Sequence, residues 1–175
     1  AHHLRQPHPL RLLDAGCGTG LFGARARPHV TRLVGVDLSP KMLERARARG
    51  IYDELFEAEL ISFLATHEPR YDAVAASDVL VYFGDLAPLF AGFRRVLRLG
   101  GRLVLSAERH DGEPGFKLGR HGRYSHSRGY LERSLESAGL TLDRVEETDA
   151  LRMEFGSKVP AWIVLAHATE PTGQR

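Results

Sequence analysis

LLDAGCGTG, residues 12–20, is the segment around which this chain is organised. A short apolar run ends on a carboxylate, Asp14, and glycines follow at once at positions 16, 18 and 20. The residues after this turn can form a helix. A strand, a glycine turn and a helix N-terminus together direct backbone N–H groups and a positive dipole end toward a ligand. The stretch therefore indicates an α/β domain that binds a nucleotide-type cofactor.

Apolar runs and helical patterns alternate along the rest of the chain. We expect strands at residues 10–14, 33–37, 55–59, 71–77, 102–108, 140–147 and 159–167, and helices at 21–27, 40–49, 61–67, 86–97 and 127–138. This alternation predicts a mainly parallel seven-stranded sheet with helices on both faces. Residues 148–158, which join the last two strands, have no helical periodicity. We therefore expect an antiparallel edge strand.

Local signals predict where two of the helices begin and end. Ser39 and Pro40 supply an N-cap and a proline at the first helical position, and Gly50 supplies a C-terminal glycine. Asp85 can cap the next long helix, which Gly100 and Gly101 would end. The expected inner faces are Met42, Leu43 and Ala46 in the first helix, and Leu86, Leu89, Phe90, Phe93 and Leu97 in the second.

The bulk composition is typical of a single globular domain. The chain has 175 residues, of which 43% are hydrophobic and 26% charged, and a net charge of +2 gives no reason to expect nucleic acid as a partner. A single cysteine, Cys17, excludes an internal disulfide and is consistent with the cytoplasm. We expect one domain over 1–175, with a lead-in at 1–9, a substrate-side loop at 109–126, a frayed tail at 169–175 and no membrane partner.

The glycines fit two classes of cofactor. Residues 18–23, GTGLFG, match the G-x-G-x-x-G pattern of dinucleotide-binding folds, and Asp37 follows Gly18 by 19 residues, as their ribose-binding acid does. Against this, Asp14 stands where a dinucleotide fold normally has an apolar residue. The spacing to Asp37 does not discriminate, so the choice depends on Asp14 and on the rest of the chain.

Four blocks, at 14–20, 36–43, 71–80 and 96–103, resemble in order the motifs of class I S-adenosylmethionine-dependent methyltransferases. Residues 122–127, with Tyr130 and Leu131, resemble a bacterial branch that is often fused to tetratricopeptide repeats, although this sequence contains no such repeats. The resemblance implies a Rossmann-like sandwich with S-adenosylmethionine as cofactor and S-adenosylhomocysteine as product.

The resemblance also implies roles for the residues of the turn. Asp14 would hold the methionine ammonium of the cofactor, directly or through water, and Asp37 would accept both ribose hydroxyls. Gly16, Gly18 and Gly20 would let the main chain approach the cofactor closely. The structural alternatives are helix caps for the two acids and ordinary turn geometry for the glycines.

Further cofactor contacts are implied after the second and third strands. Leu38 would pack on the adenine face, Leu60 could offer its backbone N–H to the ring, and Ser77 would line the site. In the family an Asp often accepts from the adenine amino group at the position of Glu59. A solvated surface role is the alternative for this longer side chain.

Methyl transfer from a sulfonium is an in-line displacement on an activated carbon, so positioning can supply much of the catalysis. Asp78 and Tyr82 follow the fourth strand at the edge where open α/β folds bind ligands, and they are the candidate catalytic residues. The alternatives are a cap for Asp78 and a half-buried core position for Tyr82.

The segment after the fifth strand is rich in basic side chains and histidines: His110, Lys117, His121, Arg120, Arg123, His126 and Arg128. A solvated loop is one interpretation, and a lid that attracts an acidic acceptor is another. Because their spacing matches no ligand pattern, we expect no metal. We predict methyl transfer to a small-molecule acceptor; the alternatives are a cofactor-binding domain without activity and a dehydrogenase.

Overall fold

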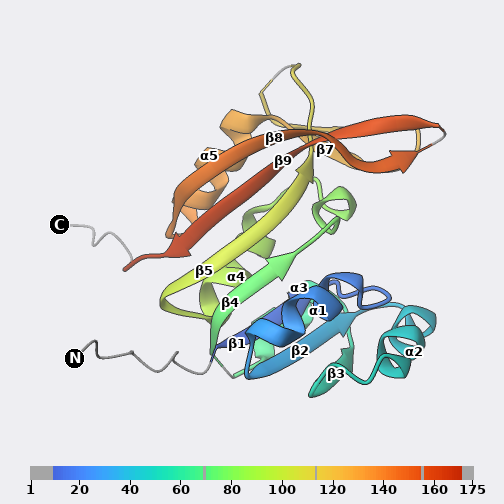
Figure 1. Ribbon diagram of the computed structural model, residues 1–175. Coiled ribbons are helices and arrows are strands. Elements are labelled where there is room, and N and C mark those ends of the chain that lie inside the picture. The colour runs from blue at the N-terminus through green and yellow to red at the C-terminus, as the bar shows by residue number, and fades with distance from the viewer. Residues whose placement is uncertain (1–9, 69, 113, 155, 171–175) are drawn as a thin grey trace, which may run out of the picture.

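The computed structural model describes residues 10–68, 70–112, 114–154 and 156–170, and a seven-stranded sheet dominates it (Figure 1). Its strands lie in the order β3-β2-β1-β4-β5-β9-β8. Strands β1 to β5 pair in parallel, whereas β9 is antiparallel to both β5 and β8. The predicted mainly parallel sheet with an antiparallel edge is therefore confirmed.

The order of the sheet strands and α-helices is the predicted one, although several of their bounds differ. The sheet contains β1 (Arg11–Ala15), β2 (Arg32–Asp37), β3 (Glu54–Glu57), β4 (Tyr71–Ala76), β5 (Leu97–Glu108), β8 (Leu140–Glu154) and β9 (Ser157–Ala168). The α-helices are α1 (Leu21–Ala26), α2 (Pro40–Ala48), α3 (Leu60–Thr66), α4 (Ala87–Val96) and α5 (Arg128–Ser137), with 3₁₀ turns η1 (Arg27–His29) and η2 (Leu80–Tyr82). A separate hairpin pairs β6 (Phe116–Leu118) with β7 (Tyr124–His126).

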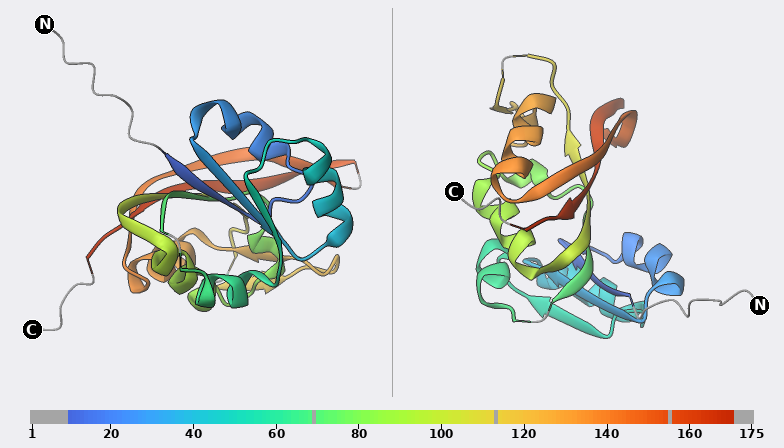
Figure 2. Two further views of the ribbon diagram at one scale, coloured as in Figure 1. Left: turned by 90° about the horizontal axis from the view of Figure 1, so that it is seen from below. Right: turned by 90° about the vertical axis from the view of Figure 1, so that its left-hand side faces the viewer.

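Helices lie on both faces of the sheet, as Figure 2 shows from two directions. The larger core lies on the face covered by α3, α4 and α5, where Leu13, Val74 and Leu103 of the sheet meet Phe90 and Phe93 of α4, all fully buried. On the α1 face, a smaller cluster around Leu12, Leu33 and Ala75 packs against Phe22 and Tyr52. Because β2 is buried on both faces, its residues 33–36, LVGV, form a continuous apolar run.

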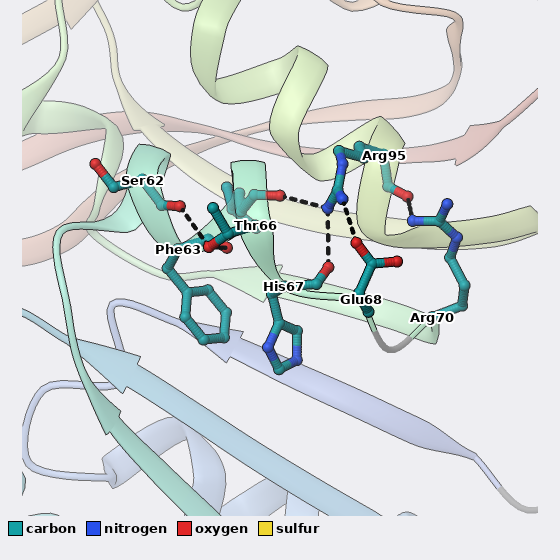
Figure 3. Close-up of polar contacts among 8 residues, drawn as sticks. Ser62, Phe63, Thr66, His67, Glu68, Arg70 and Arg95 are labelled. Carbon is teal, nitrogen blue, oxygen red and sulfur yellow. Dashed lines mark hydrogen bonds and ion pairs between the residues drawn. The ribbon is translucent and has the colours of Figure 1, made fainter.

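Arg95 of α4 fixes the far end of α3, the helix that begins at the site described below. Its Nη1 donates to the carbonyls of Leu64 at 3.0 Å and His67 at 2.8 Å, and its Nη2 pairs with Glu68 at 3.0 Å (Figure 3). The last carbonyls of a helix have no intrahelical partners, so these bonds satisfy groups that would otherwise need water.

The predicted ends of α2 are confirmed, but one of its faces is not. Ser39 Oγ accepts from the Met42 N–H at 3.4 Å, and Gly50 follows the helix with φ of 64°. Leu43 and Ala46 are buried, whereas Met42, predicted on the same inner face, is 41% exposed. Met42 instead lines the cavity described below.

Helix α4 ends earlier than predicted. Asp85 accepts from the Ala87 N–H at 3.0 Å, but the helix stops at Val96, and Leu97 begins β5 opposite Tyr71. The two glycines expected to end the helix, at positions 100 and 101, therefore lie within β5, at an irregularity in its pairing with β4.

Two segments predicted to lack regular structure contain strands. The 109–126 segment includes the β6–β7 hairpin, where the Phe116 ring contacts those of Tyr124 and Tyr130 with centroids 5.8 and 5.6 Å apart. Three-residue strands are too short to show a period of two. The 148–158 connection is likewise mostly strand, because β8 and β9 continue to Glu154 and Ser157 as a projecting ribbon (Figure 1).

The two predicted terminal segments, 1–9 and 169–175, lie wholly or largely outside the described residues. Thr169 is described and is anchored, because its N–H donates to Gly139 at 3.0 Å and its carbonyl accepts from Arg94 at 2.6 and 3.0 Å. Among the described residues, no helix combines the length and the apolar character needed to cross a membrane.

Candidate functional site

A cavity of about 490 Å³ opens at the carboxyl ends of β1, β2 and β4. The strand order reverses between β1 and β4, and open α/β sheets bind ligands at such a switch point. Nine residues predicted for the site line this cavity: Gly16, Gly18, Asp37, Leu38, Glu59, Leu60, Ser77, Asp78 and Tyr82. Asp14 and Gly20, also predicted, are not among its lining residues.

The glycine turn is tied to the end of β2. Its first N–H groups, those of Gly16 and Cys17, donate to the Val36 carbonyl at 2.8 and 3.0 Å. Gly16 has φ of 70°, and a Cβ there would lie 2.4 Å from a methyl carbon of Val79. The turn thus needs glycine at position 16 for its backbone conformation and because Val79, just before η2, packs directly against it.

Asp37 joins the turn to the start of α2. One carboxylate oxygen accepts from the Gly18 N–H and the other from the Ser39 N–H, both at 2.8 Å. Each carboxylate oxygen can accept more than one hydrogen bond. Asp37 therefore shapes the cavity wall and keeps acceptor capacity for hydroxyl groups of a ligand.

Asp14 lies beside the turn and is only 1% exposed. The Tyr52 hydroxyl donates to its Oδ2 at 2.6 Å. Burial raises the pKa of Asp14 to about 6, and the bond from Tyr52 opposes that rise while the nearby Asp37 adds to it. The sequence carries no signal for Tyr52, which reaches Asp14 from 38 positions along the chain.

Packing around Tyr52 also accounts for the G-x-G-x-x-G match. A Cβ at Gly23, the last glycine of that pattern, would lie 2.2 Å from the Tyr52 hydroxyl oxygen. A side chain at this position would displace the tyrosine ring. Gly23 is therefore explained by contact with Tyr52, and it provides no evidence for a dinucleotide.

One end of the cavity is lined by exposed apolar side chains and by the start of α3. Leu38 is 68% and Met42 41% exposed, although both are large and apolar. Glu59 is the N-cap of α3 and accepts from Ile61 N at 2.9 Å and from Ser62 N and Oγ at 2.8 Å each. Partial burial alone would raise the pKa of Glu59, but these hydrogen bonds outweigh it and hold the pKa below its ordinary value.

The other end is formed by the residues after β4. Asp78 has φ of 58°, a conformation rare outside glycine, and its N–H donates to Ser106 Oγ at 2.8 Å. Arg152 of β8 bridges the Asp78 carboxylate at 2.5 Å and that of Glu108 at 2.7 Å. Tyr82 is 68% exposed, so it is not the half-buried core residue of the alternative interpretation. Sequence reasoning missed Arg152, because only the long ribbon brings it to β4.

The basic residues of segment 109–128 do not line the cavity. Arg109 pairs with Asp111 and Glu147 at 2.7 Å each, and Arg128 pairs with Glu132 at 2.7 Å. His126 is fully buried and donates to the Phe83 carbonyl at 2.9 Å; burial lowers its pKa to about 4. Within the described ranges, no three His, Cys, Asp or Glu side chains gather closely enough to hold a metal.

Comparison with known proteins agrees with this geometry. Residues 13–105 match the family model described as a methyltransferase domain. Over 103 residues the chain is 33% identical to a ubiquinone biosynthesis O-methyltransferase of Xylella fastidiosa. That match covers 55% of this chain and 41% of the relative, so the chain spans about two fifths of the relative's length.

Solved structures of similar fold extend the likeness beyond the matched family region. An S-adenosylmethionine-dependent methyltransferase from Mesorhizobium loti is 26% identical, with a TM-score of 0.67 and 90% of each chain covered. A magnesium protoporphyrin IX methyltransferase from Synechocystis, solved with S-adenosylmethionine bound, shares the fold at a TM-score of 0.70 and 20% identity, covering 92% of this chain and 71% of that one.

Proposed function

The chain belongs to the methyltransferase-domain family, whose methyl donor is S-adenosylmethionine, and on that premise we propose that it methylates a small-molecule acceptor. The observation that carries the proposal is Asp37, which binds the Gly18 and Ser39 N–H groups at the mouth of a cavity at the sheet's switch point. A carboxylate at this position would accept hydrogen bonds from the ribose hydroxyls.

The residues present fit the cofactor. Asp37 would accept the ribose hydroxyls, and the exposed side chains of Leu38 and Met42 would pack on the adenine, which would explain why such apolar groups face the cavity. The Leu60 N–H and Glu59 lie at the same end of the cavity. The turn at Gly16 and Gly18 leaves room for the methionine part, and the cavity volume is within the usual range for small-molecule sites.

When bound, the cofactor supplies a methyl carbon activated by a sulfonium. The chain's own task is then to hold the acceptor atom in line with that carbon, which can contribute roughly 7–11 kcal/mol in favourable cases. We propose that Asp78 and Tyr82 perform this task, since both line the end of the cavity away from Leu38. A carboxylate at Asp78 can accept a hydrogen bond from an acceptor hydroxyl or amine and orient its lone pair.

Two observations support a small acceptor. The acceptor end of the cavity carries aromatic walls, Tyr82 and Phe83, that suit a compact apolar or aromatic molecule. In addition, the Xylella relative is named for ubiquinone biosynthesis and the Synechocystis structure for a porphyrin. The second candidate function is cofactor binding without turnover, because the family match at residues 13–105 and the cavity lining account for the cofactor but identify no acceptor.

Calorimetry with S-adenosylhomocysteine and with NAD tests the cofactor, and a coupled assay for S-adenosylhomocysteine release tests turnover across candidate acceptors. We expect S-adenosylhomocysteine to bind and NAD not to bind. Turnover of any acceptor excludes the binding-only alternative. Binding of NAD alone would overturn the proposed function, and cofactor binding with no acceptor turned over would favour the second candidate.

A further inference from the structure

Tyr52 lies behind the glycine turn and fills space that three glycines leave open. Ideal Cβ atoms would lie 3.1 Å from its Cε2 at Gly20, 2.2 Å from its hydroxyl oxygen at Gly23 and 2.9 Å from its Cε1 at Gly35. These glycines belong to the turn, to α1 and to β2. The surfaces of three different elements are therefore shaped around one ring.

The segment that carries Tyr52 also bonds to the turn at two points. The Tyr52 hydroxyl donates to Asp14 at 2.6 Å, just before the turn, and Arg49 Nε donates to the Thr19 carbonyl at 2.6 Å, within it. Residues 49–52, between α2 and β3, thus hold both ends of the turn, and neither Arg49 nor Tyr52 lines the cavity. The Gly18 N–H that meets Asp37 lies between these two points.

We propose that Tyr52 is a positioning residue for cofactor binding, which holds the glycine turn and the Asp14 carboxylate in the geometry that the methyl donor requires. The inference rests on the proposed function, because it assumes that S-adenosylmethionine occupies the cavity. In this role the connection between α2 and β3 holds the shape of the glycine turn, and Tyr52 contacts no reacting atom.

The electrostatic surroundings of Asp14 give this role a measurable signature. The titratable groups around Asp14 are Tyr52, Asp37 and Cys17, and Arg49 acts on Tyr52. Burial raises the pKa of Cys17 to about 12 and that of Tyr52 still further, so both remain protonated at neutral pH, and the change of charge near pH 6 belongs to Asp14. Without the Tyr52 hydroxyl, the pKa of Asp14 would rise above about 6.

The test compares Tyr52→Phe with Tyr71→Phe. The control tyrosine is 1% exposed and also hydrogen-bonds through its hydroxyl, to His67 at 2.7 Å, but it lies in the other core. Calorimetry would give the Kd of S-adenosylhomocysteine from about pH 5 to pH 8, and thermal unfolding would report on the fold. For Tyr52→Phe we expect binding about tenfold weaker near pH 7, with the midpoint of its pH dependence moved upward.

Tyr71→Phe should lower the Tm but leave the Kd within about twofold of the wild-type value and the midpoint of its pH dependence unchanged. Equal Kd values and pH profiles for wild type and Tyr52→Phe would overturn the inference and leave the proposed function intact. A wild-type protein that does not bind S-adenosylhomocysteine would instead contradict the proposed function itself.

A second pair of variants tests the ring without changing it. Gly23→Ala places a methyl group against the Tyr52 hydroxyl, whereas Gly129→Ala in α5 meets only the flexible end of Arg133 at 3.2 Å. We expect Gly23→Ala to weaken S-adenosylhomocysteine binding about tenfold, because a Cβ at 2.2 Å forces the tyrosine to move. Gly129→Ala should leave binding unchanged. Equal binding by both variants would contradict the proposed positioning role.

Discussion

Asp37 Oδ2 accepts a hydrogen bond from the Gly18 N–H at 2.8 Å, which joins the end of β2 to the middle of the glycine turn. The second oxygen of the same carboxylate accepts from the Ser39 N–H at 2.8 Å, so the side chain also fixes the start of α2. Two segments that border the cavity thus depend on one carboxylate.

Replacing Asp37 with Ala should weaken S-adenosylhomocysteine binding by at least about tenfold, because the two charge-assisted bonds that we propose to the ribose are lost together with the support of two backbone N–H groups. Asp72→Ala is a matched control. Asp72 likewise accepts a backbone N–H, from Arg11 at 2.8 Å, and pairs with Arg98 at 2.7 Å, but it does not line the cavity. Calorimetry on both variants decides; an unchanged Kd for Asp37→Ala would remove Asp37 from the site.

Replacing Arg152 with Met should destabilise the protein by about 2 kcal/mol, because Asp78 loses an ion-pair partner and the largely shielded Glu108 carboxylate loses the cation beside it. The Arg152 and Glu108 side chains are only 16% and 12% exposed. Urea unfolding measures the loss. Arg128→Met breaks an exposed pair with Glu132 and should cost no more than about 0.5 kcal/mol. Equal costs for the two variants would contradict the importance of the bridge.

Glu59→Ala should cost about 1 kcal/mol of stability at neutral pH, the usual effect of losing an N-cap. Because hydrogen bonds hold the pKa of Glu59 below its ordinary 4.5, its stabilising contribution is present above that pH and is lost as the pH falls through the lowered pKa. The difference between wild type and variant should therefore narrow in acid. The Kd of S-adenosylhomocysteine separates the two roles: several-fold weakening supports a contact with adenine, and no change supports the cap alone.

His126→Gln should remove much of the acid sensitivity of the fold. The pKa of His126 is lowered from 6.5 to about 4, so between these values the unfolded chain binds a proton that the folded chain does not. Stability therefore falls by up to about 3 kcal/mol as the pH drops from 6.5 to 4. A glutamine amide can still donate to the Phe83 carbonyl. Unfolding free energies measured across this range should be flatter for the variant, and identical slopes would show that the protonation of another group dominates.

The sequence predicted the features that depend on neighbours along the chain. Continuous apolar runs indicated buried parallel strands, and Ser39 with Pro40 marked the start of α2, as the structure confirms. The spacing from Gly18 to Asp37 likewise corresponds to a direct contact. These signals are local, or follow from the geometry of a single strand–helix–strand unit, so they can be recognised in the sequence without knowledge of the tertiary structure.

The contacts made by distant segments could not be predicted in this way. Tyr52 reaches Asp14 across β2, where Gly35 leaves space for its ring, and Arg152 reaches Asp78 only because β8 and β9 continue past the expected strand ends. The helical period predicts a core position for Met42, but it cannot show that this apolar side chain lines a cavity instead. Cavities and long-range pairs both depend on contacts between segments that are far apart in the sequence, and a local sequence pattern does not contain those contacts.

The antiparallel course of β9 has a practical consequence for handling the protein. Ala168, at the end of β9, lies at the edge where β1 begins, because Arg102 at the amino side of β5 is opposite His167. Figure 1 shows both ends of the described chain on the same side, away from the cavity at the strands' carboxyl ends. Anchoring the protein to a bead or sensor chip through either end should therefore leave the mouth of the cavity open to diffusing ligands.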